Sequence, residues 1–289
     1  MKKFKIHVLI LLSFLTVGLY ADAPVWKVSK NSNHIYIAGT MHILSKADYP
    51  LKHEFSQAFV NSDDIVFEAD LSEGESPEFQ RYIREKSVYK NGKNIKDFLS
   101  KETYSALSKY LKSKNMPLSI LNMKPGFILS TISIRLYSEA GFNVSGVDAF
   151  IEHQAKKRNK DRIYLETLKD QIEFISNLGI GNEESFIKYT LSEIDKSSVQ
   201  IPLVHKAWKN GNTQVLEEYM NEFKTLFPRA YNLMITKRNN KWIGKIEKMF
   251  DSRDIEYVLV GFAHLSGEDS ILKKLKALGY EIQRVKVTH

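Results

Sequence analysis

Cysteine is absent from the chain. The protein therefore has no disulfide bond, no thiolate nucleophile and no thiolate metal ligand, and it has no cysteine that a lipid anchor would acylate. Its stability must come from an apolar core or from a bound metal. The 289 residues are 43% hydrophobic and 11% aromatic. This composition suits one large globular domain or two small ones, and the chain is long enough to bury a sizeable core.

Long apolar runs are also missing after the N-terminal segment. A membrane-spanning helix needs about 18 uninterrupted apolar residues, and the best later candidate, PGFILSTISIRLY, is interrupted by Arg135. The N-terminus has the pattern of a secretory signal peptide, with the basic MKKFK, the apolar HVLILLSFLTVGL and the small residues of YADAP. We predict cleavage near Ala21, export to the periplasm or out of the cell, and no stable membrane span in the mature chain. An uncleaved N-terminal anchor is the alternative.

Charge and short motifs exclude further classes. The formal net charge is +8, but Lys2, Lys3 and Lys5 belong to the predicted signal peptide, and the later lysines are scattered among glutamates. The densest basic run, KKRNKDR at 156–162, does not extend into the basic stripe with interleaved aromatic residues that a nucleic-acid groove needs. We therefore expect no nucleic-acid partner. The sequence also has no Gly-x-Ser-x-Gly elbow, P-loop, His-Glu-x-x-His or dinucleotide glycine motif.

The strand and helix patterns predict an α/β fold. Segments rich in β-branched and aromatic residues predict strands, and helical periodicity dominates the middle of the chain. We predict a signal peptide over 1–21 and one domain over 22–289, in which a mixed sheet formed by the N- and C-terminal halves surrounds a large helical insertion at about 76–250. The expected strands are 25–29, 34–40, 64–71, 162–166, 255–264 and 280–287.

Polar residues lie at or near the carboxyl ends of four of these strands. They are His42 after Gly39, Glu68, Glu166, and His264 after Gly261. The functional site of an open α/β sheet lies beyond the carboxyl ends of its parallel strands, so we expect these side chains to converge. Imidazole and carboxylate groups together bind a divalent cation such as Zn²⁺ or Mn²⁺, which lowers the pKa of its bound water. Glycine before each histidine lets the backbone turn sharply and a substrate approach.

Each of these residues also has a structural interpretation. A histidine at a strand end often makes only structural hydrogen bonds, and Glu68 can pair with an arginine. Glu166 precedes Thr167 and a predicted helix, so it can serve at that helix start. Asp148 in SGVDAF is interpreted first as a helix N-cap, with a minor site role as the alternative.

Arg238 is a further anomaly, because it lies on the apolar stripe of a predicted helix. A buried guanidinium needs an acidic partner or an anionic ligand. It therefore either forms an ion pair with Glu68 or Glu166 or binds a negative charge on a substrate. The second interpretation is slightly favoured, since both acidic partners already belong to the predicted site. The stripe comprises Ile235, Arg238, Trp242, Ile246 and Met249.

Several blocks resemble the TraB/GumN family, in the family's order and over nearly all of the mature chain. They include GTMHILSKADYPL, IVFEADL, GVDAFIEHQAKKRNKDRIYLET and VGFAHLSGEDSILKKLKALGYEIQRV. The family is related to the Tiki membrane proteases and more distantly to erythromycin esterase-like and ChaN-like proteins. The resemblance implies a metal-dependent peptidase, with manganese or cobalt suggested, but it does not fix the substrate. It implies site roles for His42, His264, Glu68, Arg238 and Glu166.

We therefore expect an exported metal-dependent hydrolase that acts on a peptide or small molecule. His42, His264 and Glu68 would hold Mn, Co or Zn, Glu68 or Glu166 would act as the base, and Arg238 would bind negative charge. The alternative is a non-enzymatic periplasmic protein whose pocket captures a peptide, haem or a metal. The sequence predicts no particular oligomeric state.

Overall fold

The computed structural model describes residues 22–286, so the predicted signal peptide lies outside the described residues. A six-stranded sheet in the order β6-β4-β7-β2-β1-β8 forms the centre. Strands β6, β4, β7 and β2 are parallel to one another. Strand β1 is antiparallel to both of its neighbours, β2 and β8. The predicted mixed α/β sheet is confirmed. The strands are β1 Val25–Lys30, β2 Asn33–Thr40, β4 Asp64–Phe67, β6 Arg162–Tyr164, β7 Glu256–Gly261 and β8 Glu281–Arg284.

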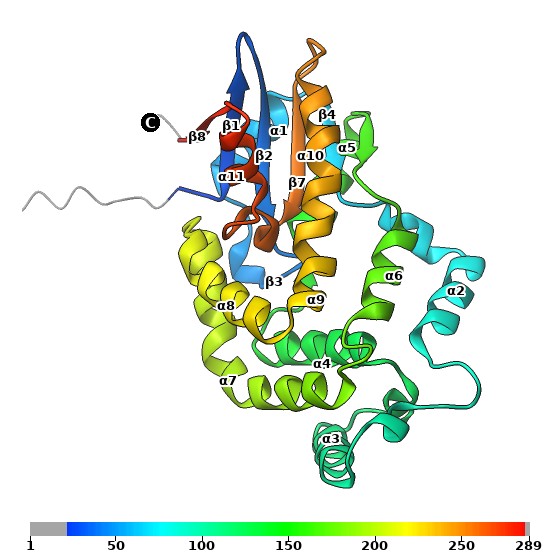
Figure 1. The fold of residues 1–289 in the computed structure, drawn as a ribbon. Helices are drawn as coiled ribbons and strands as arrows, with labels where there is room; N and C mark the ends of the chain where they lie inside the picture. Colours follow the sequence, from blue (N-terminus) through cyan, green and yellow to red (C-terminus); the bar gives the residue numbers. More distant parts are fainter. Residues whose placement is uncertain (1–21, 287–289) are drawn as a thin grey trace, which may run out of the picture.

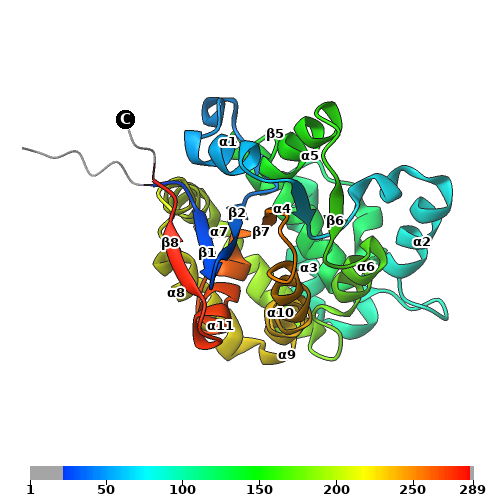
Figure 2. The same cartoon turned by 90° about the horizontal axis from the view of Figure 1, so that it is seen from above.

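The two central strands are continuous apolar runs. Strand β2 is buried from Ile35 to Thr40, and β7 is buried from Glu256 to Val260. Burial on both faces is typical of parallel strands that helices cover on each side. Figure 2 shows α1 (His53–Val60) and α5 (Val147–Lys157) on one face, and α10 (Lys237–Met249) and α11 (Ile271–Ala277) on the other.

A helical part lies beyond the carboxyl ends of β2 and β7 (Figure 1). It has apolar clusters of its own, one around Leu107 and Ile128 and another around Phe186 and Phe227. Each helix within residues 22–286 is too short or too polar to span a bilayer. The helices of this helical part are α2 Pro77–Ser87, α3 Lys101–Ser113, α4 Pro125–Glu139, α6 Leu168–Asn177, α7 Glu183–Lys209, α8 Thr213–Leu226 and α9 Pro228–Tyr231.

The end of α7 fastens the helical part to the sheet. Trp208 Nε1 donates a hydrogen bond of 2.9 Å to the carbonyl oxygen of Gly39, at the end of β2. His205 Nε2 lies 2.8 Å from Asp48 Oδ1, in the segment that follows His42. The backbone on both sides of His42 is therefore held by the same helix.

Four predicted strands are shorter than expected: 64–71, 162–166, 255–264 and 280–287, which are strands only over β4, β6, β7 and β8. The segment 64–71 leaves the sheet after Phe67, because Asp70 accepts hydrogen bonds from the backbone and hydroxyl of Ser72 and caps a 3₁₀ turn over Leu71–Glu75. Glu68 therefore lies just beyond the strand end, where its side chain is free to turn into the site.

Glu256, at the start of β7, is a buried carboxyl group in this otherwise apolar core. It is 5% exposed, and its Oε2 has no hydrogen-bond partner among the described residues. Burial, with smaller contributions from Asp64 and Asp254, raises the pKa of Glu256 from 4.5 to about 7. The folded state keeps this proton up to a higher pH than the unfolded state does. The stabilisation of the folded state by the protonated Glu256 is therefore complete below pH 4.5. It is lost as the pH rises through about 7.

Replacement of Glu256 by Gln should remove this loss. We expect Glu256→Gln to raise the free energy of unfolding at pH 8 by about 1–3 kcal/mol, because one pKa unit corresponds to about 1.4 kcal/mol. Little difference from the parent protein is expected at pH 4. Urea unfolding at both pH values measures the effect, with Glu281→Gln on exposed β8 as the control. An equal difference at pH 4 and pH 8 would contradict the assignment.

Candidate functional site

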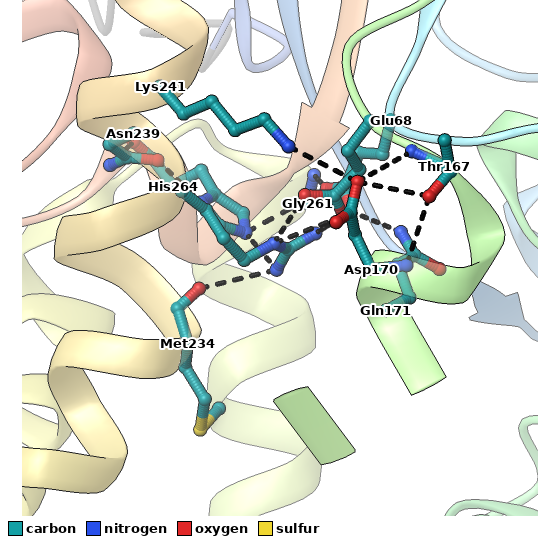
Figure 3. A network of polar contacts seen from close by, with 11 residues as sticks. Glu68, Thr167, Asp170, Gln171, Met234, Asn239, Lys241, Gly261 and His264 are labelled. Atoms are coloured by element: carbon teal, nitrogen blue, oxygen red, sulfur yellow. Dashed lines mark hydrogen bonds and ion pairs between the residues drawn. The ribbon is translucent and has the colours of Figure 1, made fainter. Parts of the chain in front are cut away.

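Arg238, in the first turn of α10, is the centre of a buried polar network. Its Nε donates to both carboxylate oxygens of Glu166 at 3.1 Å, and its Nη2 donates to Glu68 Oε2 at 2.6 Å and Glu166 Oε1 at 2.7 Å. Its Nη1 donates to the Met234 carbonyl oxygen at 3.2 Å and to His264 Nε2 at 2.9 Å. All five N–H groups of the guanidinium therefore have acceptors within the protein. Figure 3 shows the network between α10, which carries Asn239, and α6, which carries Gln171.

Two aromatic rings fix the plane of this guanidinium. Its central carbon lies 4.7 Å from the ring centroid of Phe174 and 4.6 Å from that of Trp242. Such cation–π contacts add to the ion pairs in a desolvated setting. Arg238 is therefore held from its edges by acceptors and from its faces by aromatic rings. Its ion pairs, proposed from the sequence as one alternative, are formed with both Glu68 and Glu166.

The two glutamates come from adjacent parallel strands. Glu68 follows β4 and Glu166 follows β6, and the Glu166 backbone N–H donates to the Glu68 carbonyl oxygen at 2.8 Å. Burial alone would raise the pKa of Glu68, but the positive charge of Arg238 outweighs it and lowers the pKa to about 2. Glu166 does not cap α6, because Thr167 and Asp170 form the capping box. Both carboxylates thus face Arg238.

His264 lies in the 3₁₀ turn Phe262–Leu265 and is only 4% exposed. Its Nδ1 is 2.6 Å from Asn239 Oδ1, while Asn239 Nδ2 donates to the carbonyl oxygens of His264 and Asp269. Because the amide nitrogen of Asn239 is used in this way, its oxygen must accept from the ring. The proton of His264 is therefore on Nδ1, and Nε2 is the acceptor for Arg238. Burial lowers the pKa of His264 to about 3, so the ring is neutral.

His42 has a different environment at the mouth of the site. Its Nδ1 lies 2.9 Å from Asp148 Oδ2, and Thr40 donates a 2.8 Å hydrogen bond to Asp148 Oδ1. The Asp148 carboxylate raises the pKa of His42 to about 9. The His42 side chain is 64% exposed, so its Nε2 can reach solvent or a ligand.

Asp148 reaches His42 because of a close backbone approach at Gly146. Strands β3 (Ile43–Leu44) and β5 (Val144–Ser145) pair, and Gly146 N donates to the His42 carbonyl oxygen at 3.0 Å. A Cβ at Gly146 would lie 2.0 Å from the Met41 carbonyl oxygen and 2.3 Å from the His42 carbonyl carbon. The N-cap of α5 is Gly146, so the first interpretation of Asp148 as the N-cap is wrong.

The two histidines converge at Gly261. A Cβ there would lie 3.7 Å from His42 Nε2, 3.7 Å from His264 Cδ2 and 3.4 Å from Glu68 Oε1. His42 Nε2 and His264 Cδ2 are therefore at most twice 3.7 Å apart. Gly261 N also donates a 2.7 Å hydrogen bond to Glu68 Oε1. The absence of a side chain at Gly261 leaves this meeting point open.

A cavity of about 170 Å³ opens beside His42 and Glu68. Glu166, Arg238 and His264 do not line it and lie behind Glu68. The chain thus brings all five predicted site residues together, but only two of them reach the cavity. The residues that line the cavity are His42, Phe67, Glu68, Ala69, Leu71, Asp148, Ala149, Glu152 and Gln171.

Sequence reasoning missed two residues that shape this site, Asn239 and Gln171, and gave a third, Asp148, only a minor role. Asp148, Asn239 and Gln171 orient His42, His264 and Glu68, respectively, the last through a 3.2 Å hydrogen bond. Asn239 is fully buried and lies four residues after Ile235, on the same helical stripe as Arg238. A polar residue at that spacing was a signal that could have found it.

The fold and site define an α/β protein with a buried glutamate–arginine–histidine network at the carboxyl edge of its parallel strands. The chain belongs to the TraB/PrgY/gumN family, whose model matches residues 24–284. This confirms the family resemblance. "Uncharacterized protein YbaP" of Escherichia coli (strain K12) is 22% identical over 247 residues, which cover 85% of this chain and 89% of that protein. The YbaP protein of Shigella flexneri gives the same values. No solved structure matches the chain.

The close approach at Gly146 makes a testable prediction. We expect Gly146→Ala to destabilise the protein by about 1–3 kcal/mol, because overpacking forces the backbone apart. The matched control is Gly244→Ala in α10, where a Cβ would meet nothing within 4 Å. This control should stabilise the protein by roughly 0.5–1 kcal/mol. Chemical denaturation of both variants measures the difference. Equal effects of the two substitutions would refute the proposed role of Gly146.

Proposed function

We propose that this protein is a hydrolase whose reacting groups are His42 and Glu68. The observation that carries the proposal is that His42 Nε2 and Glu68 Oε1 face the same open point at Gly261, beside a cavity that both residues line. Their other atoms are held by protein partners. Preorganised groups of this kind can position a water molecule against a bond to be broken.

His42 is the group best placed to move a proton. Asp148 fixes the ring through Nδ1, so Nε2 points toward the cavity. Histidine is the commonest general acid or base. Without the proposed cation, the protonated form of His42, which Asp148 favours, can give a proton at Nε2; the cation would take the same nitrogen in place of that proton.

Glu68 supplies a fixed negative charge. It is 8% exposed, and its ionised form is kept by Arg238 and by the backbone N–H of Gly261. Glu166 and Arg238, predicted from the sequence as a base and as an anion-binding group, lie behind Glu68, away from the cavity lining. We assign them the role of holding Glu68 in place.

The proposed cation is Mn²⁺, Co²⁺ or Zn²⁺. His42 Nε2 and Glu68 Oε1 fit such a cation, since imidazole nitrogen and carboxylate oxygen are suitable ligands and each is oriented by an outer partner. A bound cation would lower the pKa of its water. His264, the third predicted ligand, has its Nε2 engaged by Arg238. The described residues contain no group of three histidine or acidic side chains arranged around one ion.

The substrate and the location are also part of the proposal. The Tiki relationship supports a peptide bond as the substrate, and the N-terminal pattern supports action in the periplasm or outside the cell. The cavity of about 170 Å³ has room for a small group, such as one side chain of a peptide. Capture of a peptide without turnover is the competing function.

A peptide-cleavage screen tests the proposal. We expect cleavage that stops with EDTA and returns with Mn²⁺, Co²⁺ or Zn²⁺. We also expect a loss of at least about 100-fold in kcat/KM for His42→Ala and for Glu68→Gln, which is the scale of acid–base catalysis. His153→Ala, an exposed histidine on α5, is the control and should retain activity. Peptide binding without turnover under every metal condition, unchanged in His42→Ala, would identify a binding protein instead.

A further inference from the structure

We infer that His264 is a positioning residue that accepts a hydrogen bond from Arg238, and that it is not a ligand of the proposed cation. The hydrogen-bond assignment stands on geometry alone. Only its effect on turnover rests on the proposed function. The two Gly-x-x-His segments therefore have different roles, with His42 at the cavity and His264 behind it.

The first step is the tautomer that Asn239 imposes. Asn239 is fully buried, and its amide nitrogen donates to two carbonyl oxygens, at 3.2 Å to His264 and at 2.8 Å to Asp269. Its oxygen must therefore face the imidazole and accept from Nδ1 at 2.6 Å. The only lone pair of the neutral ring is then on Nε2. Asn239 thus directs the acceptor side of His264 toward Arg238.

The second step is that every N–H donor of Arg238 already has an acceptor in the observed position. Its other N–H groups are held by Glu68, Glu166 and the Met234 carbonyl oxygen, and its faces pack on Phe174 and Trp242. Withdrawal of Nη1 from His264 would leave a buried charged donor without a partner, which costs free energy. The Nε2 lone pair of His264 is therefore occupied and out of reach of a cation.

The third step links His264 to the reacting carboxylate. His264 Nε2 lies 3.9 Å from Glu68 Oε1, too far for a direct hydrogen bond. It acts through Arg238 instead, whose Nη2 holds Glu68 Oε2 at 2.6 Å. Together with the Gly261 N–H on Oε1, this contact fixes the carboxylate plane. Loss of the His264 acceptor should loosen Arg238 and let Glu68 rotate.

Nitrogen NMR of the histidine side chains in the full folded protein tests the assignment. With ¹⁵N-labelled histidine, we expect His264 to be neutral with its proton on Nδ1. On titration with Zn²⁺, the Nε2 signal of His42 should shift and that of His264 should stay. A proton on Nε2, or a Zn²⁺-dependent shift of His264 Nε2 alongside His42, would overturn the inference. If Zn²⁺ shifts neither ring, the proposed cation fails, but the tautomer still decides the role of His264.

Two variants provide the second readout. His42→Gln should weaken Zn²⁺ or Mn²⁺ binding, measured by calorimetry, by at least about tenfold. His264→Gln should weaken it less than His42→Gln does, because His264 acts on the cation only through Arg238 and Glu68, and a residue that orients a ligand changes affinity by about 10–100-fold. His264→Gln should also lower kcat, with KM little changed. A loss of metal affinity in His264→Gln equal to that of His42→Gln, in protein whose circular dichroism is unaltered, would show that His264 is a ligand.

Discussion

The contact of one guanidinium with two buried carboxylates is the interaction on which the site depends. Glu68 and Glu166 follow adjacent parallel strands, so the sheet itself brings two negative charges together, and like charges at such a distance cannot both stay ionised unaided. Arg238 solves this by donating three N–H groups to the two carboxylates, while its other two N–H groups bond to the Met234 carbonyl oxygen and to His264. A buried ion pair repays its desolvation only with geometry of this quality. The surrounding residues, from Asn239 to Trp242, serve mainly to hold that geometry.

Much of the fold and of the residue set followed from the sequence, because the approximate positions of strands are consequences of local pattern. Apolar runs identified the six strands, and parallel pairing placed Glu68, Glu166 and the two glycine–histidine segments at one edge. What could not be predicted depends on contacts between distant residues. Asp148 meets His42 only because Gly146 lets two backbones touch. Likewise, a proline usually ends a helix, yet α7 continues through Pro202 to Lys209, and its Trp208 and His205 anchor it to the end of β2 and to the segment after His42.

The two Gly-x-x-His segments show how equal spacing leads to unequal environments. After β2 the chain bends at His42 and enters β3, which leaves His42 largely exposed beside Asp148. After β7 the chain turns into a 3₁₀ helix, which folds His264 back onto Trp242, with ring centroids 4.6 Å apart. The glycines differ as well: Gly39 packs against Phe262, whereas Gly261 faces the opening shared by Glu68 and His42. A repeated motif therefore predicted the meeting place but not the role of each histidine.

The balance of charge in the network is the electrostatic argument for the proposed cation. Glu68, Glu166 and Asp148 carry three negative charges within the network, and Arg238 neutralises one of them. With both imidazoles neutral, two negative charges remain, which matches a divalent ion. Without such an ion, the Asp148 carboxylate favours a proton on the exposed ring of His42 and raises its pKa to about 9, whereas burial lowers the pKa of His264. Proton and cation would thus compete for one nitrogen, Nε2 of His42, whose side chain is 64% exposed.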